Sequence, residues 1–360
     1  MIFETILLII TIIPFIVLAV PKKQNRNLNK IDKYPKVSII ISAFNEENII
    51  LNTINRILDS NYPKDKLEIL VIIDKKTTDK TVKLLKTIKN KKLKVILGKN
   101  SKSENIGIGI KNSFGEIIGI YDADCFINKN AIKNAVKYLE DNDGVIGRYY
   151  FINERGLIEK FSAISLIQES EIMDKRICQL LDTAIYYGFD AFFKKKIIEK
   201  YSFPKDVKSE SMSLSSWLSN NNFKIISREG IDCNITVAST LRDNWKQRER
   251  WFRGVIGSMK HFFIFKNSRM KITLFFQHYT QNIPLLVLIN LFFVPNLFFV
   301  LIFANILPLR YMLEKKYYNP LLLLYPLYLA FLGTSIISAY IKEIFGVKFI
   351  WHKYERIKNE

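Results

Sequence analysis

The chain has 360 residues, of which 49% are hydrophobic, and a formal net charge of +20. This length suffices for one large domain or two smaller ones. The three cysteines, Cys125, Cys178 and Cys233, lie too far apart for a metal or redox motif and indicate a reducing compartment, and the scattered histidines argue against a zinc site. No basic stripe interleaved with aromatic residues stands out, so nucleic acid is not the expected partner. The charge fits either the lysine-rich composition of an AT-rich genome or attraction to anionic lipid headgroups.

Three apolar segments are long enough to cross a bilayer. Residues 2–20 form a nearly uncharged run that basic residues follow rather than precede, which favours a retained anchor over a cleaved signal peptide. The other two segments cover residues 283–307 and 320–341. The basic flank after the first segment predicts that residues 22–270 are cytoplasmic. The sequence therefore predicts a multi-pass protein of the cell membrane with loop 308–319 outside, although the basic residues of that loop leave a re-entrant arrangement open.

Strands and helices alternate after the first apolar segment. Between the predicted strands, apolar residues recur at helical spacing, which predicts helices. One of these helices is expected to begin at Asp79, which would cap it. Short apolar runs predict buried parallel strands at residues 37–42, 67–74, 94–98 and 116–124. The alternation predicts an α/β fold with a doubly wound, Rossmann-like, mostly parallel sheet. Ligands of such sheets bind at the carboxyl ends of the strands. One active cleft is therefore expected where the polar residues at those ends meet: Asn45, Glu46, Asp74, Asp122 and Asp124.

Asp122 and Asp124 close the last of these strands, one residue apart. Two such carboxylates can share a divalent cation with a diphosphate, and their hard oxygens suit Mg²⁺ or Mn²⁺. The cation would neutralise a nucleotide leaving group. A solvated turn is the simpler interpretation of an isolated pair. The position at a strand end, with Asp74 ending another strand, favours the metal.

Gln247, Arg250 and Trp251 share one face of a predicted helix. Arg250 can hold a phosphate, Gln247 can hydrogen-bond a hydroxyl, and Trp251 offers an aromatic plane for a sugar ring. Residues 245–265 also fit an amphipathic helix lying on a membrane, with tryptophan at the headgroup level. The two interpretations are compatible, and together they predict an acceptor site at the bilayer surface.

The order and spacing of five short blocks resemble the family 2 glycosyltransferases, membrane-bound enzymes that build sugar polymers and glycolipids from nucleotide-sugars. The blocks are residues 41–47, 73–74, 121–124, 209–211 and 247–251. The resemblance covers residues 36 to about 256 and implies a GT-A fold with transmembrane helices. It divides the chain into a transmembrane anchor (1–21), a linker (22–36), the GT-A domain (37–244), an interfacial region (245–275), two transmembrane helices (283–307 and 320–341) and a basic cytoplasmic tail (342–360). In some family members a tail like residues 351–356 folds over the cleft, and a plain basic tail is the alternative.

The resemblance also implies roles for individual residues. Lys102 could contact the donor phosphates or lie in solvent, and Lys75 replaces the second acid of a family pair, which leaves the nucleotide base open. Contacts to the donor, a UDP- or GDP-sugar, are implied for Ala43, Asn45, Glu47, Asp74, Lys102 and Asp122. The metal, Mg²⁺ or Mn²⁺, would be held by Asp122 and Asp124. The diphosphate and the acceptor would be contacted by Gln247, Arg250 and Trp251.

One departure from the family concerns the general base. Inverting members carry Glu-Asp where this chain has Glu210 and Ser211, and that Asp removes the proton from the acceptor hydroxyl. Ser211 cannot do this. Glu210 could serve if the helix start were rotated or shifted, and Asp206 is another carboxylate nearby. The resemblance thus implies inverting transfer with Glu210 as the expected base.

Three alternative functions stay open. The favoured one is a transferase that moves a sugar from a nucleotide-sugar to a lipid-linked or membrane-embedded acceptor, in contact with membrane lipids. A processive polysaccharide synthase, similar to those for cellulose, chitin and hyaluronan, is the alternative, and an oligomer is compatible with it. The replacement at Ser211 also allows a catalytically weak or inactive subunit that binds nucleotide-sugar.

Overall fold

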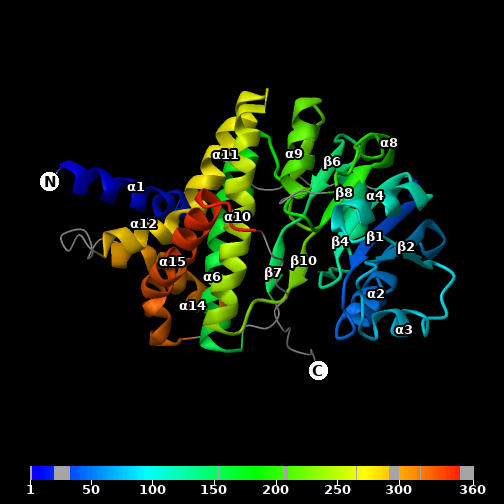
Figure 1. Cartoon of the computed structure of the whole chain (residues 1–360), viewed down its shortest axis with the longest axis horizontal. Helices are drawn as coiled ribbons and strands as arrows, with labels where there is room; N and C mark the ends of the chain where they lie inside the picture. Colours follow the sequence, from blue (N-terminus) through cyan, green and yellow to red (C-terminus); the bar gives the residue numbers. More distant parts are fainter. Residues whose placement is uncertain are drawn as a thin grey trace.

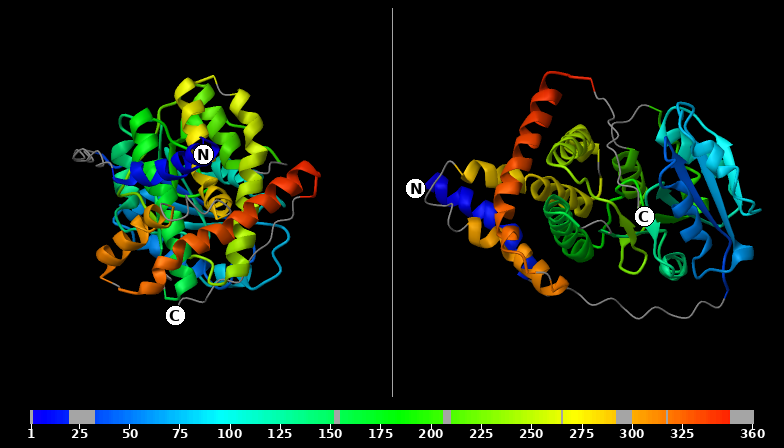
Figure 2. Two further views of the ribbon diagram at one scale, coloured as in Figure 1. Left: turned by 90° about the vertical axis from the view of Figure 1, so that its left-hand side faces the viewer. Right: turned by 90° about the horizontal axis from the view of Figure 1, so that it is seen from below.

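The computed structural model describes residues 2–19, 33–151, 155–205, 210–264, 266–291, 300–316 and 318–348. It shows an α/β lobe (residues 33–151 and 183–239) beside a helical lobe (residues 2–19, 155–182 and 241–348), as Figure 1 and the right-hand view of Figure 2 show. The chain crosses from the α/β lobe into the helical lobe after residue 151, returns for the last strands, and crosses again before residue 241.

A sheet of seven described strands forms the centre of the α/β lobe, in the order β3-β2-β1-β4-β8-β6-β9. Its strands are β1 (Val37–Ala43), β2 (Leu67–Ile73), β3 (Leu93–Leu97), β4 (Ile117–Asp122), β6 (Gly144–Ile146), β8 (Ala191–Lys194) and β9 (Ile225–Ser227). β1 pairs in parallel with β2 and β4, and β8 runs antiparallel to β4 and β6. The prediction of a mostly parallel, doubly wound sheet is confirmed. A smaller sheet joins β5 (Phe126–Ile127), β10 (Cys233–Ile235) and β7 (Tyr149–Phe151).

Helices cover both faces of the central sheet because alternate strand residues point to opposite sides. Ile39 and Ile41 of β1 pack with Ile54 of α2 (Ile50–Leu58) on one face. Ile40, between them, packs with Ile106 of α4 (Lys102–Asn112) on the other. All seven residues of β2 are buried, as expected of a strand covered on both faces. The remaining helices of this lobe are α3 (Thr81–Leu85), α5 (Ala131–Tyr138), α8 (Lys195–Ile198) and α9 (Glu210–Asn220), with a 3₁₀ turn η1 (Lys64–Lys66).

The helical lobe packs around a second apolar core, in which the ring of Phe161 stacks on that of Tyr328 at 5.2 Å. Its helices are α1 (Ile2–Ala19), α6 (Leu157–Ile172), α7 (Cys178–Leu181), α10 (Leu241–Ile264), α11 (Ser268–Gln281), α12 (Ile283–Asn290), α14 (Ile306–Lys315) and α15 (Tyr325–Ile344). A π-helical turn η2 (Met173–Ile177) and a 3₁₀ turn η3 (Pro320–Leu324) precede α7 and α15.

The membrane segments differ from the expected pattern. Within the described residues, one helical stretch is long and apolar enough to cross a membrane, namely Pro320–Ile344 with 25 residues. In its most apolar part, 56% is buried inside the protein. The expected multi-pass arrangement is therefore not supported. The segment 283–307 is not one continuous helix, because α12 ends at Asn290 and a turn at Asn305 precedes α14. Both asparagine side chains bond to backbone carbonyls one turn earlier, as polar residues at helix ends do.

Candidate active site

The carboxyl ends of β1, β2 and β4 meet at one edge of the sheet. Ala43 is the last residue of β1, and its carbonyl accepts a hydrogen bond from the backbone N–H of Asp74 at 2.9 Å. Asp122, the last residue of β4, lies opposite Ser42 of β1. This register brings Ala43, Asp74 and Asp122 to the same edge, as the sequence predicted from the parallel strand order.

The loops after β1 and β2 are joined by hydrogen bonds through side chains. Asn45, whose backbone is left-handed (φ 53°), accepts a bond from the N–H of Thr78 on its Oδ1 at 2.8 Å. Glu47 accepts one from the N–H of Lys80 at 2.9 Å, and donates its own N–H to Asp79 at 3.0 Å. Asn45 and Glu47 therefore shape the loop that carries Asp74. A direct contact of either residue with a donor is still a prediction.

Asp79 does not cap a helix in the way the sequence predicted. The helix α3 begins two residues later, at Thr81, and the residue at its cap position makes no side-chain cap bond. Asp79 instead accepts bonds from the N–H and the hydroxyl of Thr81, at 3.0 and 2.6 Å, and from Glu47. The competing interaction is a local turn that short carboxylate side chains form with the backbone.

Lys102, the first residue of α4, links three segments at the site. Its ammonium Nζ lies 2.6 Å from Oδ1 of Asp122 and 3.4 Å from Oε1 of Glu210, and donates to the carbonyl of Gly188 at 3.0 Å. The side chains of Lys102, Asp122 and Glu210 keep exposed fractions of 36%, 31% and 22%, so a ligand can reach them. Burial alone would lower the pKa of Lys102, but the two carboxylates raise it well above its usual value, and the side chain is fully cationic.

Gly188 leaves the space in which these side chains meet. Its φ is +96°, a conformation that residues with a side chain rarely adopt. A Cβ at this position would lie 3.3 Å from Oε1 of Glu210 and 3.5 Å from Nζ of Lys102. The need for glycine at this position follows from the way α4 and α9 are placed.

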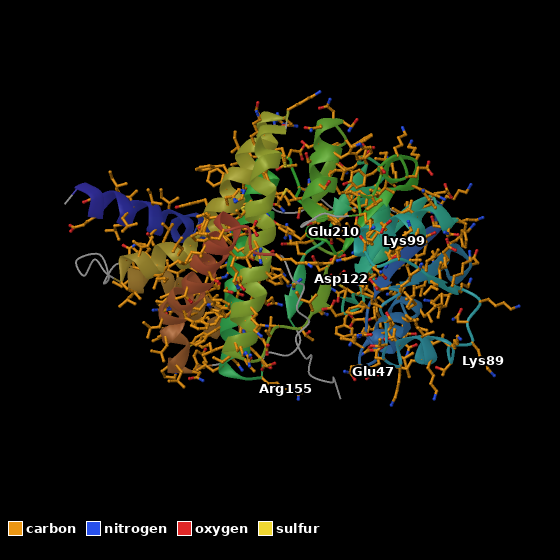
Figure 3. The ribbon with its side chains drawn as sticks, viewed as in Figure 1. Glu47, Lys89, Lys99, Asp122, Arg155 and Glu210 are labelled. Carbon is orange, nitrogen blue, oxygen red and sulfur yellow. The ribbon has the colours of Figure 1, made fainter. Side chains whose placement is uncertain are left out.

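Glu210 begins α9, and its side chain points toward Lys102. Asp122 and Glu210 lie on the side of the α/β lobe that faces the helical lobe (Figure 3). Ser211 follows on the same helical turn, where its carbonyl accepts a bond from Ser215. The other acid considered as a base, Asp206, lies outside the described residues, as does Ser209. The structure therefore places the carboxylate of Glu210, expected as the base, next to the predicted donor and metal residues.

Gln247, Arg250 and Trp251 lie on α10, which packs between α9 and the rest of the helical lobe. Gln247 is buried, and Trp251 packs against α6 in a cluster that includes Ala163 and Leu166. All three residues thus lie on one helix of the helical lobe. Their contacts with a ligand stay predictions. The C-terminal block at residues 351–356 lies outside the described residues.

Arg248 and Glu169 form a charged pair beside Trp251 that the sequence did not indicate. The guanidinium of Arg248 lies 3.6 Å from Oε2 of Glu169 and 5.3 Å from the centre of the Trp251 ring. Both line a cavity of about 50 Å³ between α6, α10 and α15. Glu169 also accepts a bond from Gln281 at 2.7 Å. No local motif marks this pair, since it depends on how α6 and α10 pack.

Asp122 and Asp124 are the residues that could hold a metal. Both are half-buried at the turn after β4, and their oxygens are the donors that Mg²⁺ and Mn²⁺ prefer. Among the described parts of the chain, no three Asp, Glu, His or Cys side chains gather in a metal-binding arrangement. The two carboxylates fit a cation that takes its other ligands from a diphosphate or water, and they do not form a complete protein cage.

The comparisons with known proteins bear on this geometry. Residues 38–202 match the family model described as glycosyl transferase family 2. This segment is a family 2 glycosyltransferase domain. The predictions of a glycosyltransferase and of the GT-A fold are thereby confirmed. A mannosyltransferase from Pyrobaculum calidifontis, solved with GDP-Man and Mn²⁺, has the same fold: it aligns with a TM-score of 0.62 at 20% identity over 96% of this chain and 99% of its own.

Curated relatives extend the similarity beyond the family segment. A probable glycosyltransferase, YdaM of Bacillus subtilis, is 28% identical over 283 residues, which cover 74% of this chain and 67% of YdaM. The poly-β-1,6-N-acetyl-D-glucosamine synthase of Staphylococcus aureus is 24% identical over 62% of this chain, and the chain spans 55% of its length. The poly(ribitol-phosphate) β-N-acetylglucosaminyltransferase TarS of the same species is 25% identical, and the chain spans 34% of its length.

Proposed function

We propose that the protein transfers one sugar, with inversion, from a nucleoside-diphosphate-sugar to a hydroxyl of a lipid-linked or membrane-embedded acceptor. The observation that carries this proposal is the contact of Lys102 with both Asp122 and Glu210 at the carboxyl end of β4. It joins a cation, a predicted metal ligand and a carboxylate base in one half-exposed cluster. Relatives that are named for transfer of N-acetylglucosamine, and a similar fold solved with GDP-Man, support a UDP- or GDP-sugar as donor.

In this proposal each part of the site has one task. Asp74 contacts the nucleoside from the loop that Asn45 and Glu47 shape. Asp122 and Asp124 would hold Mg²⁺ or Mn²⁺, which when bound neutralises charge on the diphosphate leaving group. Lys102 offers its ammonium to the phosphates and keeps the Asp122 carboxylate in place. An ammonium acts here as a compact point charge, which suits a phosphate oxygen.

Glu210 removes the proton from the acceptor hydroxyl. The acceptor oxygen then forms a bond to the anomeric carbon while the bond from that carbon to the diphosphate oxygen breaks, and the proton stays on Glu210. A base of this kind must lie within hydrogen-bonding reach of the hydroxyl. Gln247, Arg250 and Trp251 on α10 would hold the acceptor.

The test is donor consumption and product formation by membranes containing the full chain, with a panel of UDP- and GDP-sugars and with Mn²⁺, Mg²⁺ or EDTA. We expect metal-dependent consumption of one donor, lost in Asp124→Asn and kept in Asp65→Asn, a control at an exposed acid on η1. Binding of nucleotide without turnover of any donor would contradict the proposal and support an inactive subunit instead.

A processive synthase is the second candidate, because the similarity to the poly-N-acetylglucosamine synthase covers 62% of this chain and the chain keeps the block at Gln247, Arg250 and Trp251. The size of the radiolabelled product separates the two: a single discrete product supports the single-sugar transferase, and a ladder supports the synthase.

A further inference from the structure

The C-terminal end of α15 is fastened to a charged helix of the same lobe. Glu343 accepts a bond from Nε of Arg253 on α10 at 2.7 Å, and Lys342 lies 2.5 Å from Oε1 of Glu249 on the same helix. Such charges are costly inside the hydrocarbon core of a bilayer. Because α10 also packs on α9 of the α/β lobe, this end of α15 lies on the side of the membrane that holds the catalytic domain.

The other end of the stretch lies on the same side. The turn η3 packs against α6 and α14, and Tyr325, which follows it, donates its hydroxyl to Gln168 of α6 at 3.0 Å. One turn further along α6, Glu171 is buried and lies 3.6 Å from the guanidinium of Arg310 on α14. The helix α6 follows β7 of the α/β lobe directly. Both ends of α15 therefore contact charged helices, α10 and α6, that are joined to the catalytic domain by packing or by the chain.

A helix with both ends on one side of a membrane cannot cross it. In the right-hand view of Figure 2, α15 runs transverse to α1 and α12 rather than alongside them. The helix α12 has 8 residues, a length of about 12 Å at 1.5 Å per residue, against roughly 30 Å for the hydrocarbon core. The loop 308–319, which the sequence placed outside, contacts α6 through α14.

The surface of this end of the molecule is apolar and rimmed by positive charge. In the left-hand view of Figure 2, which looks onto it, α1, α12, α14 and α15 lie toward the viewer. The exposed apolar side chains recur at helical spacing on α15 and continue onto η3 and α1. We call this the membrane face: Ile6, Ile9, Ile10, Ile13, Leu321, Leu323, Leu324, Leu327, Ile337, Ile341 and Ile344. Exposed lysines, Lys315, Lys316 and Lys348, complement anionic headgroups.

We propose that the helical lobe binds an anionic lipid bilayer from one side, with α15 lying in the plane of the interface and loop 308–319 in the same compartment as the catalytic domain. The proposal deepens the membrane part of the proposed function and replaces the predicted crossing of residues 283–341. Exposed apolar side chains gathered on one face and bordered by polar residues mark interaction or membrane sites, and the lysines favour a lipid surface over a second copy of this positively charged chain.

Cysteine accessibility in sealed membrane vesicles tests the topology of the full chain. The three native cysteines are buried, so single reporters can be added at the exposed Glu314 in the disputed loop and at the exposed Lys89 of the α/β lobe, labelled in Figure 3. We expect a membrane-impermeant maleimide to label Glu314→Cys and Lys89→Cys from the same face, with complete loss of both signals in vesicles of the opposite orientation. Labelling after detergent normalises the two signals.

Labelling of Glu314→Cys only from the opposite face, or from neither face of sealed vesicles, would overturn the proposal. This readout needs no transferase activity, so a protein that fails the donor assay still reports its topology.

Flotation with vesicles tests the occupant of the membrane face. We expect the purified chain to float with vesicles of phosphatidylcholine and phosphatidylglycerol in equal parts and to lose binding in Ile337→Glu/Ile341→Glu. The control, Val95→Glu, changes an exposed apolar residue of the edge strand β3 and should float as the parent does. Equal flotation of the parent and Ile337→Glu/Ile341→Glu, or a detergent-free dimer in place of vesicle binding, would overturn the lipid assignment.

Discussion

The ammonium of Lys102 lies 2.6 Å from Oδ1 of Asp122, so a cation of the protein already occupies one of the two carboxylates that would receive a divalent metal. Lysine and metal ion therefore repel each other across the same ligand, while both attract a diphosphate. Lys102 should therefore favour binding of the donor and disfavour binding of the metal.

Replacing Lys102 by methionine should have opposite effects on the two ligands. We expect Lys102→Met to bind Mn²⁺ more tightly, since a neighbouring positive charge is removed, and to lose about a hundredfold in kcat, the effect of deleting one charge-stabilising donor. Titration of bound Mn²⁺ by electron paramagnetic resonance and initial rates measure the two effects. Lys111→Met, at an exposed position of the same helix, should change neither, and weaker Mn²⁺ binding in Lys102→Met would contradict the assignment.

The role of Glu210 can be separated from that of Ser211. If Glu210 is the base, Glu210→Gln should lower kcat by at least about a hundredfold, the usual contribution of general base catalysis, with little change in donor affinity. Glu199→Gln, at an exposed acid that ends α8, serves as the control. A Glu210→Gln variant that keeps full activity would exclude this base, and recovery of that variant by Ser211→Asp would show that the position used in the family can still serve.

Gly188 should be irreplaceable for two separate reasons. We expect Gly188→Ala to lower stability by about 1–3 kcal/mol, the cost of a left-handed backbone in a residue with a side chain, and to lower activity further by crowding Glu210 and Lys102. The matched control is Gly346→Ala, which has φ +63° and no atom near the added Cβ. Thermal unfolding and kcat of both variants separate strain from crowding, and an active Gly188→Ala would show that the cluster tolerates displacement.

The buried Asp190 should make the stability of the protein fall as pH rises. It is fully buried, and burial, followed by the nearby Asp232, raises the pKa of its carboxyl well above the usual value. The folded state then binds a proton that the unfolded state has released, so stability falls as pH rises above the unfolded pKa of about 3.9 toward the folded one. Asp190→Asn should therefore raise Tm, more at pH 8 than at pH 5.

The control for this prediction is Asp182→Asn, at an exposed residue with the same left-handed backbone (φ 51° against 48°). Its Tm should keep the pH dependence of the parent. An unchanged difference in Tm between the two pH values in Asp190→Asn would show that Asp190 is ionised in the folded protein.

Much of the α/β lobe could be predicted because its signals are local. The run at β2 is apolar except for Glu68, and a parallel sheet necessarily brings the carboxyl ends of β1, β2 and β4 together, which places Asp74 and Asp122 at one edge. The contact of Lys102 with Glu210 could not be predicted in this way, because it depends on how α4 and α9 approach across the sheet edge.

The helical lobe was predicted less well, for a related reason. Apolar length shows that a segment avoids water, but it does not show the direction in which the segment runs. The stretch Pro320–Ile344 is long enough to cross a membrane. Its C-terminal end is nevertheless held by charged pairs with α10, and its N-terminal end by the hydrogen bond of Tyr325 with Gln168 of α6. The segment 283–307 also breaks after Asn290, a single polar residue whose effect is lost when hydrophobicity is averaged over the whole segment.

The hydrogen bond from Thr78 to Asn45 has a consequence for the thermodynamics of ligand binding. It joins the loops after β1 and β2 within the folded chain, with Asn45 already in its unusual backbone conformation. The loss of conformational entropy in these loops then belongs to folding and not to the arrival of a nucleotide. Because these two loops are already ordered, more of their contact energy with a nucleotide appears as binding affinity. Closure of the loops then does not limit the rate at which the nucleotide associates.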